Sequence, residues 1–274
     1  MKKSLNNSLD WDIKSQPVST ITGLPTNHRA IMRTDNNQIL GIVGSKYKPF
    51  ANRQLIKLCK TIEKVSNFKI EGFSEFKGGK LVMAFIRNQS PALKLSGLDL
   101  NEYLVIGNSH DESRQLFIGT AQHLIRCENQ FFSSVPLFKA RHIGGLGITD
   151  DFAKMLRNEY ELGRKALYNA IETLPSKKIN HMLIDKLIVH LLNTDKEVPD
   201  DAEKKRIMNS IQGKSLRASI DHETKDLGLN AFGLFNGVTW FTSHELKTGS
   251  HNFGNATGVA QLLNAKALSF CNKL

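Results

Sequence analysis

The sequence is poor in the features that mark secreted and membrane proteins. It has three cysteines in 274 residues, and Cys59, Cys127 and Cys271 lie far apart. Their number and spacing indicate a reducing compartment and exclude a disulfide framework or a zinc knuckle. No apolar run approaches the roughly 20 residues of a membrane span. The opening MKKSLNNSLDWDIKSQ carries charge but no apolar signal-peptide core. We therefore expect a cytoplasmic protein with no membrane partner.

The common motifs of catalysis and cofactor binding are also missing. The nine histidines show no metal-ligand spacing of the HExxH kind and no recognisable triad order. Gly144-Gly145-Leu146-Gly147 precedes an expected helix but lacks the Lys-Ser/Thr of a phosphate-binding loop. A hinge is the favoured interpretation of these glycines. We expect no cofactor and no ATP site.

Positive charge is what the sequence has in excess. The formal net charge is +11 at pH 7 and the isoelectric point is about 9.5. Residues 1–150 hold 20 Lys and Arg against 12 Asp and Glu, whereas residues 151–274 hold 17 against 14. Such an excess serves solubility, or it indicates binding to nucleic acid or to an anionic membrane. Charge alone does not decide between these alternatives.

Apolar periodicity and turn residues predict three regions. Residues 1–29 are polar and are expected to form a flexible N-terminal arm. Residues 30–143 are expected to form a basic β-rich core and residues 144–274 a mainly helical region. Strands are predicted within 30–43 as a hairpin and over 68–76, 80–87 and 102–108, with a strand or a helix start at 116–125. Helices are predicted over 52–66, 151–174, 179–192, 201–212 and 258–271. The predicted fold class is α+β: a mostly antiparallel sheet with a packed helix, followed by a helical C-terminal half.

Basic residues gather near the predicted turns and strand ends. Lys46-Tyr47-Lys48 and Arg53 join a turn to a helix start, where phosphates could meet lysines and free backbone N–H groups while Tyr47 stacks on a base. Lys77 and Lys80 flank Gly78-Gly79, which is a tight-hairpin signal. The complete set of candidate nucleic-acid-binding residues is Lys46, Tyr47, Lys48, Arg53, Lys77, Lys80, Arg87, Arg114, Arg126 and Arg141.

Two other interpretations stay open. A metal-dependent enzyme acting on nucleic acid or nucleotides would use His110, Asp111 and His123. However, adjacent residues of a strand point to opposite faces, and polar turn chemistry also explains the cluster around His110. Alternatively, the helical segment 151–212 would bind a host protein, which makes the chain an interaction factor.

Several segments carry a resemblance to a known family. They are LGIVGSKYKPFANRQL (40–55), GGKLVMAFIR (78–87), YLVIGNSHDES (103–113), TAQHLIRCENQ (120–130) and FNGVTWFTSHEL with FGNATGVAQLLNAKALSF (253–270). Over roughly residues 27–270 the chain resembles a phage- and plasmid-like family of unknown function. The resemblance implies a mobile-element origin and assigns no activity.

The predicted order of a helix, three antiparallel strands and a long basic segment is also similar to the core of phage and eukaryotic single-strand annealing proteins. That similarity implies an oligomeric ring or filament with single-stranded DNA in a basic groove. Our leading hypothesis is therefore a non-enzymatic, ATP-independent DNA-binding and strand-annealing protein of phage or plasmid recombination, acting in the bacterial host cytoplasm.

Overall fold

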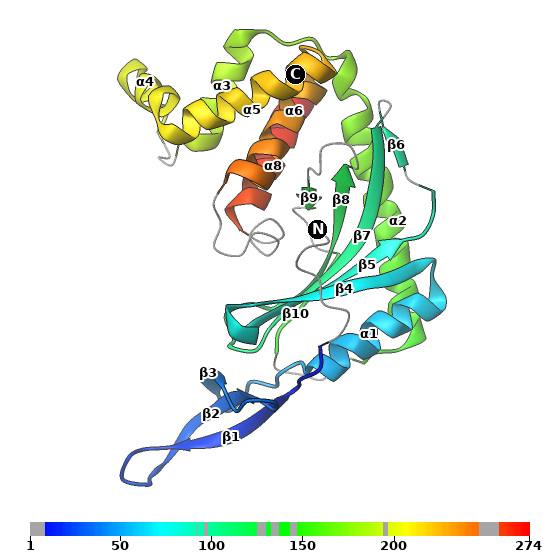
Figure 1. Cartoon of the computed structure of the whole chain (residues 1–274), viewed down its shortest axis with the longest axis vertical. Coiled ribbons are helices and arrows are strands. Elements are labelled where there is room, and N and C mark those ends of the chain that lie inside the picture. The colour runs from blue at the N-terminus through cyan, green and yellow to red at the C-terminus, as the bar shows by residue number, and fades with distance from the viewer. Residues whose placement is uncertain are drawn as a thin grey trace. The chain divides into compact units, whose positions relative to one another are not determined.

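The chain divides into two units, each assembled from segments that are not continuous in sequence. The computed structural model describes residues 9–91, 93–95, 98–124, 130–132, 137–142, 147–193, 197–246 and 258–274 (Figure 1). Unit 1 comprises Met1–Pro91, Glu102–Thr120 and Val135–Gly163, and unit 2 comprises Ala92–Asn101, Ala121–Ser134 and Arg164–Leu274. The predicted regions 30–143 and 144–274 meet at a single boundary, whereas each of the two units consists of three separate segments. The fold class is α+β, as predicted, with antiparallel sheets and with helices concentrated in the C-terminal half.

A small antiparallel sheet lies near the N-terminus of unit 1. Its strands are β1 (Ile13–Ser19), β2 (Pro25–Arg33) and β3 (Ile39–Gly44), in the order β1-β2-β3. The predicted hairpin over 30–43 is present as the β2–β3 pair, in which Ile31 faces Gly41. The predicted arm, by contrast, contains all of β1 and the start of β2. Polar composition suggested disorder, but backbone pairing to β2 orders β1, and Ile13 packs beside the buried Ile31 and Val43.

The larger sheet has the order β10-β8-β7-β5-β4. Its strands are β4 (Phe68–Phe76), β5 (Leu81–Asn88), β7 (Leu98–Ser109), β8 (Leu116–Leu124) and β10 (Phe138–Ala140), while β6 (Leu93–Leu95) pairs with β7 and β9 (Gln130–Phe132) pairs with β8. The segment at 116–125 is thus a strand and not a helix start. The division between the two units passes through β7 and β8.

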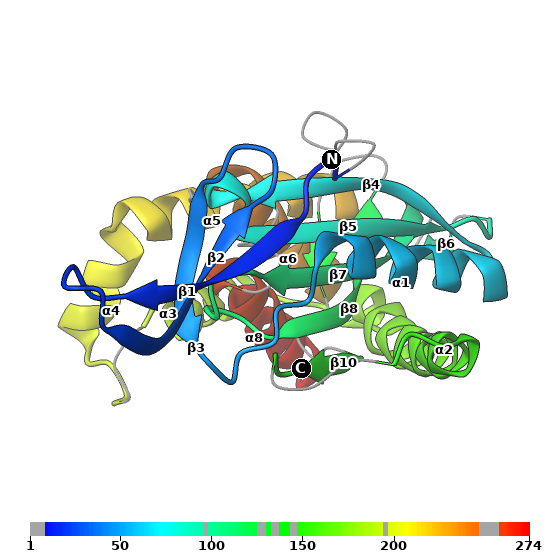
Figure 2. The same ribbon diagram turned by 90° about the horizontal axis from the view of Figure 1, so that it is seen from below.

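Two helices complete the core of unit 1. Helix α1 (Asn52–Val65) buries Leu55, Leu58 and Ile62 against the sheet, and the first half of α2 (Asp150–Glu172) adds Leu156 and Tyr160. Figure 2 shows α1 lying along the sheet, close to β4 and β5. Burying large apolar side chains stabilises the unit by about 1.5–3 kcal/mol for each side chain. The opposite face of α1 is left to solvent.

Unit 2 is built mainly from helices packed around one apolar core. They are α3 (His181–Leu192), α4 (Asp201–Asn209), α5 (Ile211–Leu227), α6 (Ala231–Trp240), which continues into the π-helical turn η4 (Phe241–Glu245), and α8 (Val259–Asn272). The predicted helix at 201–212 is in fact α4 and the start of α5, because the Ser210 side chain accepts a hydrogen bond from Gly213 N and starts a new helix. Among the helices in the described ranges, none is both long and apolar enough to cross a bilayer. Gly144, Gly145 and Leu146 of the predicted hinge lie outside the described residues.

Candidate nucleic-acid interface

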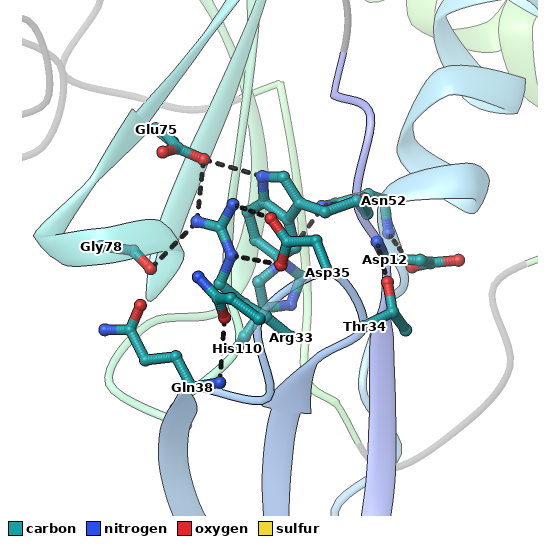
Figure 3. A network of polar contacts seen from close by, with 11 residues as sticks. Asp12, Arg33, Thr34, Asp35, Gln38, Asn52, Glu75, Gly78 and His110 are labelled. Carbon is teal, nitrogen blue, oxygen red and sulfur yellow. Dashed lines mark hydrogen bonds and ion pairs between the residues drawn. The ribbon is translucent and has the colours of Figure 1, made fainter.

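A buried polar junction joins the N-terminal segment to the larger sheet (Figure 3). The Trp11 indole Nε1 donates to Glu75 Oε2 at 2.7 Å, and the Arg33 guanidinium carbon lies 4.0 Å from the centre of the Trp11 ring. The Arg33 guanidinium also donates two hydrogen bonds to the Asp35 carboxylate, at 2.9 and 2.8 Å, and one to Gly78 O at 3.3 Å. A buried guanidinium needs such partners, because an unpaired charge is costly away from water. Arg33 therefore fixes the small sheet and is not a free phosphate ligand.

The start of α1 is capped from a distance by Asp12. Its Oδ1 atom accepts from Asn52 N at 3.0 Å, and its Oδ2 atom accepts from Arg53 Nη1 at 3.1 Å. Ala51 N donates to Gln54 Oε1 at 2.8 Å. A carboxylate is favourable at a helix N-terminus because it satisfies unpaired N–H groups and complements the helix dipole. The amides of Ala51 and Asn52 are therefore already bonded within the chain, which reduces the free N–H groups that the predicted phosphate contact could use.

His110, a candidate acid/base residue, is fully buried in the same junction. Its Nε2 lies 3.0 Å from Asn52 Oδ1, and its ring meets the Trp11 ring edge-on at 5.7 Å. Asn52 Nδ2 donates to Trp11 O, so Asn52 Oδ1 is the acceptor and we assign the Nε2–H tautomer to His110. The neighbouring Asp111 accepts from Ser113 N at 3.1 Å, which is turn chemistry. The structure does not describe the His123 side chain. Among the residues that it does describe, no three or more His, Cys, Asp or Glu side chains are grouped so that they could hold a metal ion.

Burial of His110 predicts a loss of stability in mild acid. Desolvation, with a contribution from His142, lowers the pKa of His110 to about 4. The unfolded chain has a histidine pKa of about 6.5, so it binds the proton first as the pH falls. Stability from neutral His110 is therefore complete above about pH 6.5 and falls by about 2 kcal/mol at about pH 5. Urea unfolding at about pH 7.5 and pH 5 measures this loss.

The matched variant for that experiment is His110→Gln, which cannot gain a proton in this range. We expect its free energy of unfolding to depend less steeply on pH than that of the native chain. Some dependence remains, because burial also lowers the pKa of His142. An equal slope for the two chains would show that His110 does not cause the acid sensitivity.

Four of the predicted cations belong to segments that meet around Tyr47 and His142. Tyr47 OH donates to Ser109 O at 2.9 Å, the Tyr47 and His142 rings lie 5.0 Å apart, and Lys48 N donates to His142 O. Ser109 Oγ donates to Arg114 O at 2.8 Å, which brings in the β7–β8 turn. We call the exposed cations of these segments the loop cluster; they are Lys46, Lys48, Arg114 and Arg141, and the acidic Glu112 is exposed beside Arg114.

Tyr47 does not have the predicted position. Only 5% of it is exposed, because its ring packs with Ile31 and Val43 beneath the small sheet. Burial, with Asp111 nearby, raises the pKa of its hydroxyl. Its ring face is therefore not available to stack on a base, and Tyr47 positions the loop cluster instead.

A second basic surface runs along α1, and only its first residue was among the predicted candidates. Arg53, Lys57, Lys60 and Lys64 are all exposed and follow the spacing i, i+4, i+7 and i+11, so they form one stripe, which we call the α1 stripe. The stripe extends over about 16 Å at 1.5 Å per residue. Arg53 pairs with Asp12 and Lys64 with Asp150, whereas Lys57 and Lys60 have no acidic partner within the described part of the chain. Helical periodicity applied to basic residues would have revealed the stripe.

The other predicted cations are spread more widely. Lys77 and Lys80 flank the β4–β5 turn, where Gly78 and Gly79 adopt positive φ angles of 67° and 93°. Arg87 lies at the far end of β5, about 23 Å from Lys80 at 3.3 Å per residue, so the two are not brought together. Arg126 lies outside the described residues.

Together these observations define an α+β protein whose antiparallel sheet unit carries basic side chains on one helix and on adjoining turns. The chain belongs to the family described as Domain of unknown function (DUF932), whose model matches residues 39–264. The match begins at the first residue of β3, so β1 and β2 precede it. No curated protein and no solved structure is significantly similar to the chain.

Proposed function

We propose that the protein binds single-stranded DNA through unit 1 and anneals complementary strands without ATP, as a factor of phage or plasmid recombination. The α1 stripe is the observation that carries this proposal. It presents four cations on one face of a helix whose other face is anchored in the core. A rigid row of this kind suits the regularly repeated phosphates of a nucleic acid strand better than scattered surface charges do.

The charge of the whole unit supports the same function. Unit 1 contains 20 Lys and Arg against 13 Asp and Glu, a net charge of +7. Phosphate contacts would release counterions and provide most of the affinity, independently of base sequence. With Tyr47 buried, the contacts available on these surfaces are mainly to phosphates. Bases that are not held by the protein stay exposed, which is what pairing with a complementary strand requires.

The test compares two double variants that remove the same charge from different helices. Lys57→Ala/Lys60→Ala removes the two stripe lysines that have no acidic partner in the described structure. Lys204→Ala/Lys205→Ala removes two exposed lysines from α4 and is the control. Fluorescence anisotropy with a labelled strand of about 40 nucleotides, compared with the matching duplex, measures affinity over a salt series.

We expect the stripe variant to bind single strands about tenfold more weakly and to lose about 1.4 from the slope of log K against log salt, because each phosphate contact contributes about 0.7. The α4 variant should bind like the native chain. Addition of the complementary strand without ATP should then give accelerated duplex formation. No binding at low salt, or equal binding by both variants, would refute the interface; binding without acceleration would remove annealing from the proposal.

A further inference from the structure

The small sheet has two edge strands, and they differ in their protection against pairing. Strand β1 contains Lys14 and Pro17, which are the residues that natural sheets place on edges to block further strands. Strand β3, with the sequence ILGIVG, contains no charge and no proline, and it pairs with β2 in regular register from Gly41 to Gly44, after a register shift at Leu40. Within the described residues, β3 pairs with β2 alone, so its outer edge has no partner strand.

Strand β3 also exposes large apolar side chains. Ile39 is 54% exposed and Ile42 is 60% exposed, although Leu40 and Val43 of the same strand are buried. The strand lies against the β7–β8 turn, because a Cβ added to Gly41 would lie 2.7 Å from Asp111 Cα. An exposed and uncharged edge is a ready template for another strand.

We propose that β3 pairs antiparallel with β3 of a second copy of this chain. The strand carries no charge that would repel its own copy, and antiparallel self-pairing uses both open edges at once. Pairing β3 with β1 of another copy would instead meet Lys14 and Pro17, and proline has no N–H to donate. The contact is therefore isologous and closes as a dimer with a continuous six-stranded sheet. A ring or filament would need a second surface.

The experiment measures the oligomeric state of the full chain by sedimentation velocity, from about 1 to about 100 µM. Ile42→Lys and Ile39→Lys place a charge on the pairing edge, where two copies would oppose each other. Ile21→Lys is the matched control, since Ile21 is fully exposed in the β1–β2 turn, away from that edge. Far-UV circular dichroism and thermal melting check that each variant folds.

We expect the native chain and the Ile21→Lys variant to form dimers, and the two edge variants to dimerise at least tenfold more weakly. Amide exchange over residues 39–44 should slow as the native protein concentration rises. A native chain that stays monomeric at the highest concentration, or an Ile42→Lys variant that sediments like the native chain, would overturn the proposal.

Salt dependence separates this inference from the proposed DNA binding. The β3 contact uses backbone hydrogen bonds and apolar side chains between copies that each carry a net charge of +11, so added salt should strengthen dimerisation by screening repulsion. DNA binding should weaken under the same conditions. The experiments can therefore refute the proposed dimer without refuting the proposed DNA binding, and the reverse is equally possible.

Discussion

Replacing Trp11 by alanine is expected to lower the free energy of unfolding by about 3–5 kcal/mol, the usual cost of truncating a buried tryptophan. The ring contacts Arg33 on one side and the edge of His110 on another, and its N–H donates to Glu75. Truncation would open a cavity where the N-terminal segment, α1 and the β4–β5 turn meet. It would also leave Arg33 without its ring contact. Urea unfolding followed by far-UV circular dichroism measures the change.

Trp11→Phe is the matched control for that change. It keeps most of the apolar contact but removes the hydrogen bond to Glu75, and we expect a cost of about 1–2 kcal/mol. A Trp11→Ala chain as stable as the native one would mean that the small sheet does not depend on this junction. Equal losses in the two variants would assign the effect to the hydrogen bond and not to packing.

Much of the fold could be predicted because its signals are local. Helix α1 was predicted over 52–66 and is observed over Asn52–Val65, since apolar residues recur there at helical spacing. The predicted strand 68–76 coincides with β4, and 80–87 is within one residue of β5 at each end. Strand β1 was missed because its order depends on pairing with residues 25–33, and its own composition is polar. Helix α6 was missed because its residues up to Thr239 are all buried, so it shows no polar stripe.

The candidate site was less predictable, because side-chain positions depend on contacts distant in sequence. Tyr47 was expected to stack on a base, yet its hydroxyl donates a hydrogen bond to the backbone carbonyl of Ser109, 62 positions away at the end of β7. Asp12 caps a helix that begins 40 residues later, and nothing near Asp12 signals this. The α1 stripe, in contrast, is purely local. It could have been predicted from the spacing of Arg53, Lys57, Lys60 and Lys64 once the helix had been identified.

Gly237→Ala is the second change with a large expected effect, a loss of about 3 kcal/mol in the free energy of unfolding. Helices α5 and α6 pack closely at this glycine, and an added Cβ would lie 2.4 Å from Ile220 Cα. A backbone atom cannot swing away as a flexible side chain can, so the two helices would have to separate. Separation would loosen the buried residues Leu216, Ile220 and Phe235 of the unit 2 core.

The same substitution at Gly163 in α2 gives the control, because there an added Cβ would lie 3.6 Å from Leu137 Cδ2, an ordinary contact. Alanine is more favourable than glycine in a helix interior by about 1 kcal/mol, so Gly163→Ala should stabilise the chain by up to that amount. Urea unfolding of both variants should therefore give changes of opposite sign. If both variants gained stability, the close approach of α5 and α6 would not exist in solution, and helix propensity alone would govern both positions.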